Sequence, residues 1–440
     1  MLGQPSYEQL IAPLLQAVPA AASRILDVGC GEGRLGQRLK ETGDASRQVF
    51  GIESDPAKAA AAAKLLDLVF RLNLETEIPP IEPGSLDCIL FSGSLERSAD
   101  PLALLRRLRP LLRDDGVILC RVANAQYFPV VASLFTNDFQ AGEDLSLFTL
   151  SSIYKLLLDG DLLPTLVHAT ISPCGDAVLA AATPLAEHFR IAPEEIHQRL
   201  SSLQYILKAF PLPAIAEAEE PMSFVACSND EMQLANNLAS SPIFKDGRHE
   251  LLVYRNVASA AHGINEGIEK ARHRLVVALH QDIYIPDGWP ARFQAQWRAA
   301  EAEFGPIGLA GVFGVAIQPN GMQRTGCIID RSRLIAPPYS LPAKGISLDE
   351  VILAFPKETP VRLDPAVGWH CYGTDAALQT AQNGLITAIL DAPCLHNSRF
   401  SGLGTDFVAS ATALAGLYRE PRPLFTTCIK IDGEGKLSGW

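Results

Sequence analysis

Long apolar runs and paired cysteines are both missing from this sequence of 440 residues. No stretch approaches the roughly 20 apolar residues that a membrane-spanning helix needs. The N-terminal stretch MLGQPSYEQLIAPLLQAVPAAASR lacks the basic start and continuous apolar segment of a signal peptide. The nine cysteines are odd in number and none stands in a CxxC pair, which argues against a disulfide framework or a zinc site. We therefore expect a soluble protein of the reducing cytoplasm without a transmembrane segment.

Positive charge is also scarce. The chain has 37 lysines and arginines against 49 aspartates and glutamates, a formal net charge of −12. This balance argues against nucleic acid or an anionic membrane as a main partner. The remaining composition, 48% hydrophobic and 7% aromatic residues, is that of a globular protein, and the length favours two or three domains.

Strand-like runs alternate with helix-like stretches twice along the chain, which predicts an α/β fold with two domains. The first series comprises RILDVG, QVFGIE, LDCILFS and GVILCRVA, and it fades after about Thr183. The stretch PEEIHQRLSSLQYILKAF is interpreted as a helix, and PLPAIAEAEEP as a semi-rigid linker. A second series begins at SFVACSN. The predicted parts are therefore a domain over 1–183, a helical segment and linker over 184–220, and a domain over 221–440.

A glycine-rich loop follows the first predicted strand. In ILDVGCGEGRLGQRL the glycines Gly29, Gly31 and Gly33 permit a sharp turn and close approach of a ligand to bare backbone. The next strand, QVFGIES, ends in Glu53, where a carboxylate can accept both hydroxyls of a ribose. A purely structural turn would explain the glycines alone but not their spacing from Glu53.

Several segments in order resemble the class I S-adenosylmethionine-dependent methyltransferases over roughly residues 1–183. LDVGCGEG is similar to the first motif of that family, VFGIESD to the second and LNLETEIP to the third. The block GSLDCILFSGSLERSADPLALLRRLRPLLRDDGVILCRVAN and the segment LSLFTLSSIYKLLLDGDL continue the resemblance. It implies a Rossmann-like sheet that binds S-adenosylmethionine. The cofactor-binding residues that it implies are Asp27, Gly29, Gly31, Gly33, Glu53, Asn73, Leu74 and Ser92.

The roles implied by this resemblance differ among these residues. The glycines would line the methionine part with Asp27 supporting the loop, Glu53 would hold the ribose, Asn73 and Leu74 would border the adenine, and Ser92 would face the transferred methyl group. Asn73 replaces the usual aspartate, but its carbonyl oxygen still accepts a hydrogen bond. Arg97 stands where many relatives have a histidine, and arginine stays protonated. It is either a substrate-binding residue that grips a phosphate or carboxylate of the acceptor, or a solvated residue at a helix start.

In the second half, the stretch RLVVALHQDIYIPDGW places Asp282 at the end of an apolar strand. A carboxylate in that position can coordinate a divalent cation that bridges a nucleotide diphosphate. The strand FVACSN, followed by a polar turn and a helix, is the kind of strand-to-helix turn at which open α/β sheets bind nucleotides.

This second half resembles, over about 221–435, glycosyltransferases of the GT-A fold, specifically the glycosyltransferase-like family related to a streptomycin biosynthesis protein. The matching segments are FVACSNDE, AHGINEGIEKARHRLVVALHQDIYIPDGW, LDEVILAF, GWHCYGTDAALQTAQNGL and CLHNSRF. The resemblance implies a metal site of Asp282, His280 and His396 for Mn²⁺ or Mg²⁺, with His280 replacing the first aspartate of the family's DxD motif. It implies Asp375 as the catalytic base. The substrate-binding residues that it implies are Ser228, Asn229, Glu231 and Asn265.

Each of these assignments has a structural alternative. His396 could be a hydrogen-bonded structural histidine, and Asp375 could be a helix cap that contributes about 1 kcal/mol. Asp349 and Glu350 could orient either the acceptor or a helix.

We therefore expect a bifunctional enzyme of polysaccharide or glycosylated-metabolite biosynthesis. It would transfer a methyl group from S-adenosylmethionine and a sugar from a nucleotide-diphosphate donor to a glycan or glycosylated small molecule. One alternative is an active methyltransferase whose GT-A-like domain only binds glycan. Another is a scaffold in which both pockets have lost their chemistry.

Overall fold

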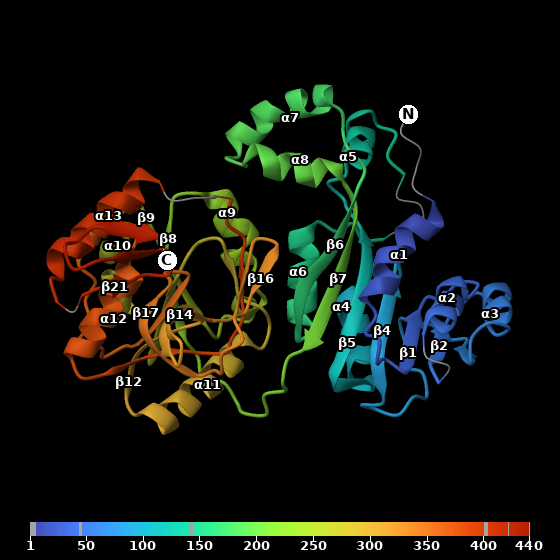
Figure 1. Cartoon of the computed structure of the whole chain (residues 1–440), viewed down its shortest axis with the longest axis horizontal. Coiled ribbons are helices and arrows are strands. Elements are labelled where there is room, and N and C mark those ends of the chain that lie inside the picture. The colour runs from blue at the N-terminus through green and yellow to red at the C-terminus, as the bar shows by residue number, and fades with distance from the viewer. Residues whose placement is uncertain (1–5, 44–45, 141–144, 400–403, 421, 440) are drawn as a thin grey trace. The chain divides into compact units, whose positions relative to one another are not determined.

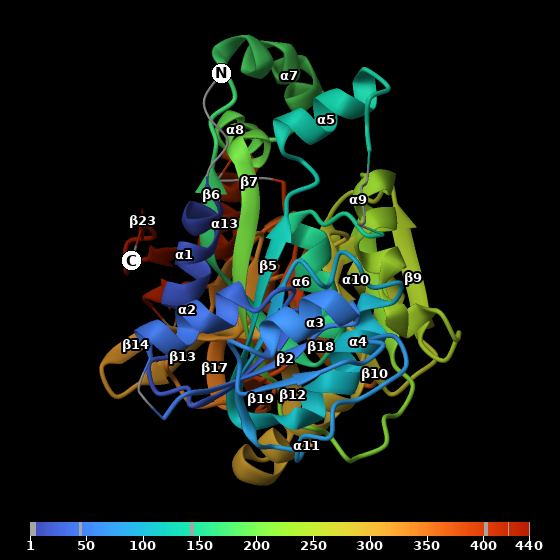
Figure 2. The ribbon, with the colours of Figure 1, turned by 90° about the vertical axis from the view of Figure 1, so that its right-hand side faces the viewer.

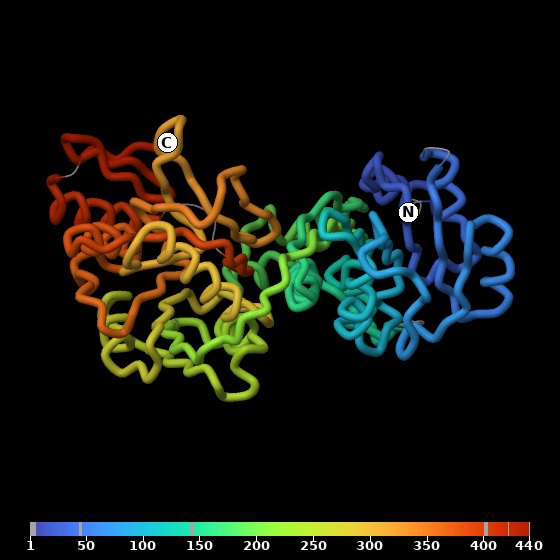
Figure 3. The backbone as a smooth tube through the Cα atoms, turned by 90° about the horizontal axis from the view of Figure 1, so that it is seen from below, coloured from blue at the N-terminus to red at the C-terminus, as the bar shows by residue number. Residues whose placement is uncertain are grey.

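The computed structural model describes residues 6–43, 46–140, 145–399, 404–420 and 422–439. The chain divides into two compact units, Met1–Ala214 and Ile215–Trp440, each continuous in sequence (Figure 3). Among the described residues, no helix is long and apolar enough to cross a membrane.

The first unit is built on a seven-stranded sheet in the order β3-β2-β1-β4-β5-β7-β6 (Figure 1). Strands β1 to β5 are parallel, and β7 runs antiparallel to both β5 and β6. This is a Rossmann-like arrangement in which the chain order reverses between β1 and β4. The strands are β1 (Arg24–Val28), β2 (Gln48–Ile52), β3 (Leu68–Phe70), β4 (Leu86–Ser92), β5 (Leu112–Ala123), β6 (Leu162–Ile171) and β7 (Ser202–Pro211).

Side-chain caps set the starts of several helices of this unit. Ser6, Asp55 and Asp100 each accept backbone hydrogen bonds at the beginning of α1, α3 and α4. Helices α5, α7 and α8 lie together at one end of β6 and β7 (Figures 1 and 2). The helices are α1 (Tyr7–Ala17), α2 (Arg34–Thr42), α3 (Pro56–Ala62), α4 (Pro101–Leu108), the short 3-10 turn η1 (Arg109–Leu111), α5 (Phe128–Phe135), α6 (Leu150–Asp159), α7 (Asp176–His188) and α8 (Pro193–Ser201).

The stretch expected to be one helix from Pro193 to Phe210 changes conformation halfway. Helix α8 ends at Ser201, and residues 202–211 form β7 in the sheet of the first unit. The reason is tertiary, because Tyr205, Ile206 and Leu207 are buried where β7 pairs with β5 on one side and β6 on the other. The sheet is therefore mixed rather than all parallel, and the first unit extends to Ala214.

The second unit has a nine-stranded mixed sheet in the order β14-β13-β17-β19-β12-β18-β10-β8-β9 and two small sheets. Strands β9 and β10 both run parallel to β8, one on each side. The strands are β8 (Ser223–Ser228), β9 (Glu250–Arg255), β10 (Leu275–Leu279), β11 (Ile283–Tyr284), β12 (Ile307–Gly311), β13 (Phe313–Gln318), β14 (Gly321–Gly326), β15 (Ile328–Asp330), β16 (Arg333–Ile335), β17 (Ala343–Leu348), β18 (Ile352–Pro356), β19 (Ile386–Ile389), β20 (Leu395–His396), β21 (Leu424–Phe425), β22 (Ile429–Ile431) and β23 (Leu437–Gly439).

Two apolar clusters form the core of the second unit. One includes Trp289 and Phe293, and the other includes Ile264 and Phe355. The helices that contribute to the two clusters, or lie next to them, are α9 (Glu231–Asn236), α10 (Ala260–Lys270), α11 (Trp289–Phe304), α12 (Tyr372–Gln382) and α13 (Thr405–Leu417). The short 3-10 turns are η2 (Leu238–Ser240), η3 (Pro242–Phe244) and η4 (Pro365–Val367).

Candidate functional sites

A cavity of about 750 Å³ opens at the carboxyl ends of the parallel strands of the first unit. This first-unit cavity lies at the point where strand order reverses, which is where open α/β sheets bind their ligands. Its lining residues are Tyr7, Asp27, Gly29, Cys30, Gly31, Glu32, Arg34, Leu35, Glu53, Ser54, Asp55, Lys58, Asn73, Leu74, Glu75, Ser92, Ser94, Arg97, Ser98, Leu104 and Arg121. All the residues predicted to bind the cofactor line it except Gly33.

The loop between β1 and α2 requires glycine at two positions for different reasons. Gly29 has φ 73°, and a Cβ there would lie 3.0 Å from Cβ of Ser94. Gly33 has φ 83°, forms the N-cap of α2, and would bring a Cβ within 3.0 Å of Cα of Ala62. Gly29 therefore keeps the cavity open, whereas Gly33 permits α2 and α3 to approach.

Two carboxylates border this loop, and their environments differ. Glu53 accepts hydrogen bonds from the backbone N–H groups of Gly31 and Asp55, both at 2.9 Å. Asp27 is 1% exposed, and neither of its carboxylate oxygens has a hydrogen-bond partner among the described residues. Burial, together with the charge of Glu53, raises the pKa of Asp27 to about 7. A buried carboxylate without partners is costly unless a ligand supplies them.

The adenine-side and methyl-side candidates are held by local hydrogen bonds. Oδ1 of Asn73 accepts from the N–H of Glu75, and the N–H of Asn73 donates to the carboxylate of Glu77. The Ser92 hydroxyl accepts from Nε of Arg121 at 3.1 Å. Asn73, Leu74 and Ser92 all line the cavity.

Three cavity residues need separate mention. Arg97 is exposed at the cavity, and its Nη2 would lie 3.4 Å from a Cβ built on Gly29. Two further lining residues, Tyr7 from α1 and Arg121 from β5, are not among the residues predicted to bind the cofactor. Arg121 could have been found by its position, because GVILCRVA places one arginine in an otherwise apolar strand.

In the second unit, some of the predicted residues lie where β8 and β10 end. Strand β8 lies between β9 and β10 in the sheet. The loop after β8 leads toward β9, away from β10, so the loops that follow β8 and β10 diverge at a switch point. Gln281 joins the two loops, since its Oε1 accepts from the hydroxyl of Ser228 and from the N–H groups of Asn229 and Asp230. Its Nε2 donates to Oδ1 of Asn229. Ser228 and Asn229 thus lie at this switch point, and no motif in the sequence indicated the bridging role of Gln281.

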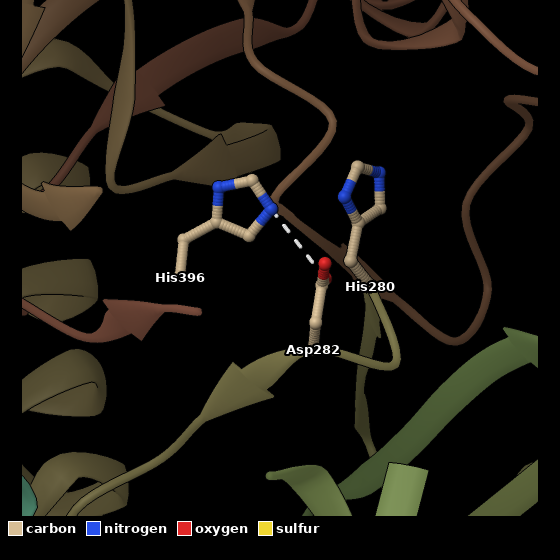
Figure 4. A group of neighbouring side chains, drawn as sticks. All are labelled: His280, Asp282 and His396. Carbon is tan, nitrogen blue, oxygen red and sulfur yellow. Dashed lines mark ion pairs between the residues drawn. The ribbon is translucent and has the colours of Figure 1, made fainter. Parts of the chain in front are cut away.

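His280, Asp282 and His396 form one cluster, which we call the His–Asp cluster (Figure 4). One ligand atom from each residue lies within 4.8 Å of the others. Nε2 of His396 is 3.4 Å from the carboxylate of Asp282. The pairing of Ile283 with His396 in β11 and β20 brings these distant segments together. Two imidazoles and a carboxylate are a ligand set suited to a transition metal ion.

Each histidine of the cluster is oriented by a further residue. Nδ1 of His396 is 2.9 Å from the carboxylate of Asp330, and Nε2 of His280 is 3.1 Å from the hydroxyl of Tyr372. The other ring nitrogens, Nε2 of His396 and Nδ1 of His280, point toward the space between the three side chains (Figure 4). The carboxylates of Asp282 and Asp330 raise the pKa of His396 to about 10, and His396 in turn holds the pKa of Asp282 at about 2 despite its burial.

Asp375, predicted as the catalytic base, is fully buried at the start of α12. Its carboxylate accepts hydrogen bonds from the hydroxyl of Tyr418, the N–H of Asp364 and Nε2 of Gln379. Burial raises the pKa of Asp375 above its usual value. These contacts fix the segment between β18 and α12, and the side chain of Asp375 is shielded from solvent.

Two predicted substrate-binding residues also have structural partners. Glu231 forms an exposed ion pair with Arg255, and Asn265 exchanges two hydrogen bonds with the backbone of Leu363. Neither contact involves Gln281 or a residue of the His–Asp cluster.

Glu350 lies in the neighbourhood of the His–Asp cluster. Burial and the charge of Asp349 raise the pKa of Glu350 to about 8. Burial raises the pKa of Tyr372, and the charges of Glu350 and Asp282 raise it further. The hydroxyl of Tyr372 contacts His280. A carboxyl group with a pKa near neutrality is suited to proton transfer.

Residues 4–162 match the family model described as a methyltransferase domain. The ubiquinone biosynthesis O-methyltransferase of Xanthomonas campestris pv. campestris (strain B100) is 30% identical over 113 residues, which is 24% of this chain and 45% of that protein. The enzyme of the same name from Cereibacter sphaeroides (strain ATCC 17029 / ATH 2.4.9) is 32% identical over 120 residues, 26% of this chain and 45% of its own length. The chain thus spans less than half of the length of these relatives.

Among solved structures, a SAM-dependent methyltransferase from Archaeoglobus fulgidus aligns with 47% of this chain and 94% of its own, with 15% sequence identity and a TM-score of 0.36. The family match confirms that the first unit contains a methyltransferase domain.

Proposed function

We propose that the first unit binds S-adenosylmethionine and transfers its methyl group to an acceptor. The observation that carries this proposal is the first-unit cavity, where the glycine loop and the Glu53 carboxylate border one space at the switch point of the sheet. The match of residues 4–162 to a methyltransferase domain supports it. When bound, S-adenosylmethionine supplies an electrophilic methyl group on a sulfonium.

The residues present fit this cofactor. Each oxygen of Glu53 accepts one backbone hydrogen bond and retains a lone pair, so the carboxylate can also accept the ribose hydroxyls. The partnerless oxygens of Asp27 lie in the same cavity and suit the ammonium group of the amino-acid half. Asn73 and Leu74 would border the adenine, and Ser92 the methyl group. The resemblance to O-methyltransferases favours a hydroxyl acceptor.

Replacing Glu53 with glutamine is expected to weaken binding of S-adenosylhomocysteine by roughly tenfold or more, because an amide loses one acceptor toward the ribose. Isothermal titration of the full chain measures this, with Glu41→Gln as the control because Glu41 lies in an exposed ion pair with Arg38 on α2. A wild-type chain that does not bind S-adenosylhomocysteine would contradict the proposed function, and equal binding by Glu53→Gln would contradict the role of Glu53.

We further propose that the second unit is a GT-A-type glycosyltransferase that uses a nucleotide-diphosphate sugar and a divalent cation, for glycan or glycosylated-metabolite biosynthesis. The observation that carries this proposal is the His–Asp cluster next to the end of β8, at the switch point of a mixed sheet. His280, Asp282 and His396 would hold the cation, and Ser228 and Asn229 would lie by the nucleotide. The two imidazole ligands favour Mn²⁺ over Mg²⁺, which prefers oxygen ligands.

Glu350 is a better candidate than Asp375 for the base that deprotonates the acceptor hydroxyl. Its pKa of about 8 and its position relative to Tyr372 and His280 support this role. The three hydrogen bonds that Asp375 accepts support a structural role for that residue instead.

Two substitutions separate these roles. Glu350→Gln is expected to lower turnover of a nucleotide-diphosphate sugar by about 100-fold or more without lowering the melting temperature, because it removes the base and keeps the shape. Asp375→Asn is expected to lower the melting temperature by several degrees, because one buried acceptor is lost.

The assay is release of nucleotide diphosphate from a panel of uridine-, guanosine- and thymidine-diphosphate sugars with Mn²⁺, alongside thermal unfolding. Glycan binding without turnover of any donor would favour the alternative of a non-catalytic glycan-binding domain. Full activity in Glu350→Gln would contradict the role of Glu350.

A further inference from the structure

Asp27 and Arg121 carry opposite charges, line the first-unit cavity from the same face of the sheet, and form no ion pair with each other. Asp27 pairs with Leu90 across β1 and β4, and Ser92 pairs with Arg121 across β4 and β5. Paired residues, and residues two apart on a strand, point to the same face, so Asp27, Ser92 and Arg121 share one face of three neighbouring strands.

Arg121 is held in place by uncharged partners. Its Nε donates to the hydroxyl of Ser92 and its Nη1 donates to Oε1 of Gln204 at 3.1 Å. Gln204 is buried and donates to the carbonyl of Leu10 on α1. The guanidinium group of Arg121 is therefore connected to α1 through Gln204. Among the described residues, no carboxylate lies within ion-pair distance of Arg121. A partly buried guanidinium with neutral partners is therefore prepared for an anion.

Arg97 approaches the same carboxyl edge of the sheet from the segment that follows β4. Its Nη2 lies near Gly29 at the end of β1, and Nη2 of Arg121 lies 3.1 Å from a Cβ built on Gly93 at the end of β4. Arg97 has no hydrogen bond or ion pair with any part of the chain that the structure describes. Strands β1 and β4 are direct neighbours, so the two guanidinium groups, which we call the arginine pair, border the junction between them.

We propose that the arginine pair, Arg97 and Arg121, binds the α-carboxylate of the amino-acid half of the cofactor, while Asp27 binds its ammonium group. This inference rests on the proposed cofactor and assigns residues to its head group. A zwitterion completes both halves of the site, because it provides the cation that Asp27 lacks and the anion that the arginines lack. Arg97 then recognises the cofactor and not the acceptor.

The alternative source of an anion is the acceptor, which would carry its own carboxylate or phosphate to the same arginines. The two sources differ in one measurable respect. If the arginines bind the cofactor, they discriminate between S-adenosylhomocysteine and its decarboxylated form, S-adenosylthiopropylamine, which differs only in the α-carboxylate.

Isothermal titration of the full chain with these two ligands tests the inference. The wild-type protein is expected to bind S-adenosylhomocysteine roughly tenfold to hundredfold more tightly than the decarboxylated form. In Arg121→Met and in Arg97→Met this ratio is expected to fall toward unity through weaker binding of the carboxylate-containing ligand alone. Arg113→Met is the matched control, because Arg113 also lies on β5 but its partners are Asp87 and Asp115.

The ratio within one variant does not depend on how much of the sample is folded. An unchanged ratio in both variants overturns the inference, as does an equal loss of affinity for both ligands, which indicates a structural role. A wild-type chain that binds neither ligand nor methylthioadenosine overturns the proposed function and the inference together. Wild-type binding of methylthioadenosine with no preference for the carboxylate overturns the inference alone.

Discussion

Asp282→Asn is expected to weaken Mn²⁺ binding by the second unit by about 100-fold or more, because it removes the anionic ligand of the His–Asp cluster. The two imidazoles that remain carry no negative charge to offset the charge of the cation. His396→Ala should have an effect of similar size, since Nε2 of His396 faces Asp282 at 3.4 Å. Electron paramagnetic resonance of free Mn²⁺ or calorimetry measures the loss.

The residues behind the ligands should have smaller effects. Asp330→Asn is expected to weaken Mn²⁺ binding by roughly 10-fold to 100-fold, because Asp330 orients His396 through Nδ1 without touching the metal. Asp246→Asn, which alters an exposed ion pair with Arg248 in the same unit, should have no effect. Thermal unfolding shows whether each variant is folded. Unchanged Mn²⁺ binding in a folded Asp282→Asn variant would contradict the metal site.

The sequence contained enough information to place the loop of the first unit. The strand endings at Val28 and Ile52 are clear in the apolar pattern, and parallel neighbours place their carboxyl ends at one edge. The contact between Gly31 and Glu53 follows from this register. The position of Ser92 beside the cavity can be predicted in the same way, because the apolar run of β4 ends at this residue.

Contacts over long sequence separations could not be predicted. The segment LQYILKAF has no local feature that distinguishes a helix from a strand, and it becomes β7 only because β5 and β6 present open edges on both sides. Asp330 contacts His396 across 66 positions through the pairing of β15 with β20. Gln281 stands in the segment HQDIYIPDGW, but its contacts with the loop after β8 depend on the order of strands in the sheet.

The position of Asp375 in its motif did not predict the contacts of its side chain. The sequence placed it at the start of a helix, and α12 does begin nearby at Tyr372. The direction of its side chain depends on Tyr418 and Asp364, which no local pattern connects to it. Glu350, by contrast, was interpreted only as an orienting residue, because burial sets its pKa and burial cannot be read from LDEVILAF.

Asp27→Asn is expected to stabilise the ligand-free protein above neutral pH and to weaken cofactor binding at the same time. The pKa of Asp27 is raised from 3.8 to about 7 by burial and by Glu53. The folded state therefore holds a proton that the unfolded state loses between about pH 4 and pH 7. Stability contributed by this group is complete below pH 4, falls as pH rises through that window, and is constant above it. At roughly 1.4 kcal/mol per pKa unit, the total effect is at most on the order of 4 kcal/mol.

The measurement is thermal unfolding of the wild-type chain and Asp27→Asn from pH 4 to pH 8. The two should differ little at pH 4, and the variant should melt higher by several degrees at pH 8. Asp87→Asn is the control of opposite sign, because hydrogen bonds from the backbone of Ser23 and Arg24 lower the pKa of Asp87 below its usual value. That variant should be less stable than the wild type above about pH 4.

Binding should change in the reverse direction. At pH 8 the ionised Asp27 attracts the ammonium group of S-adenosylhomocysteine, so Asp27→Asn is expected to bind this ligand roughly tenfold or more weakly. At pH 6 the wild-type carboxyl must lose its proton on binding, and the difference between the two proteins should shrink. A variant that is more stable and binds equally well would show that Asp27 has no ligand. A variant that is less stable at pH 8 would show that its oxygens are already paired in the free protein.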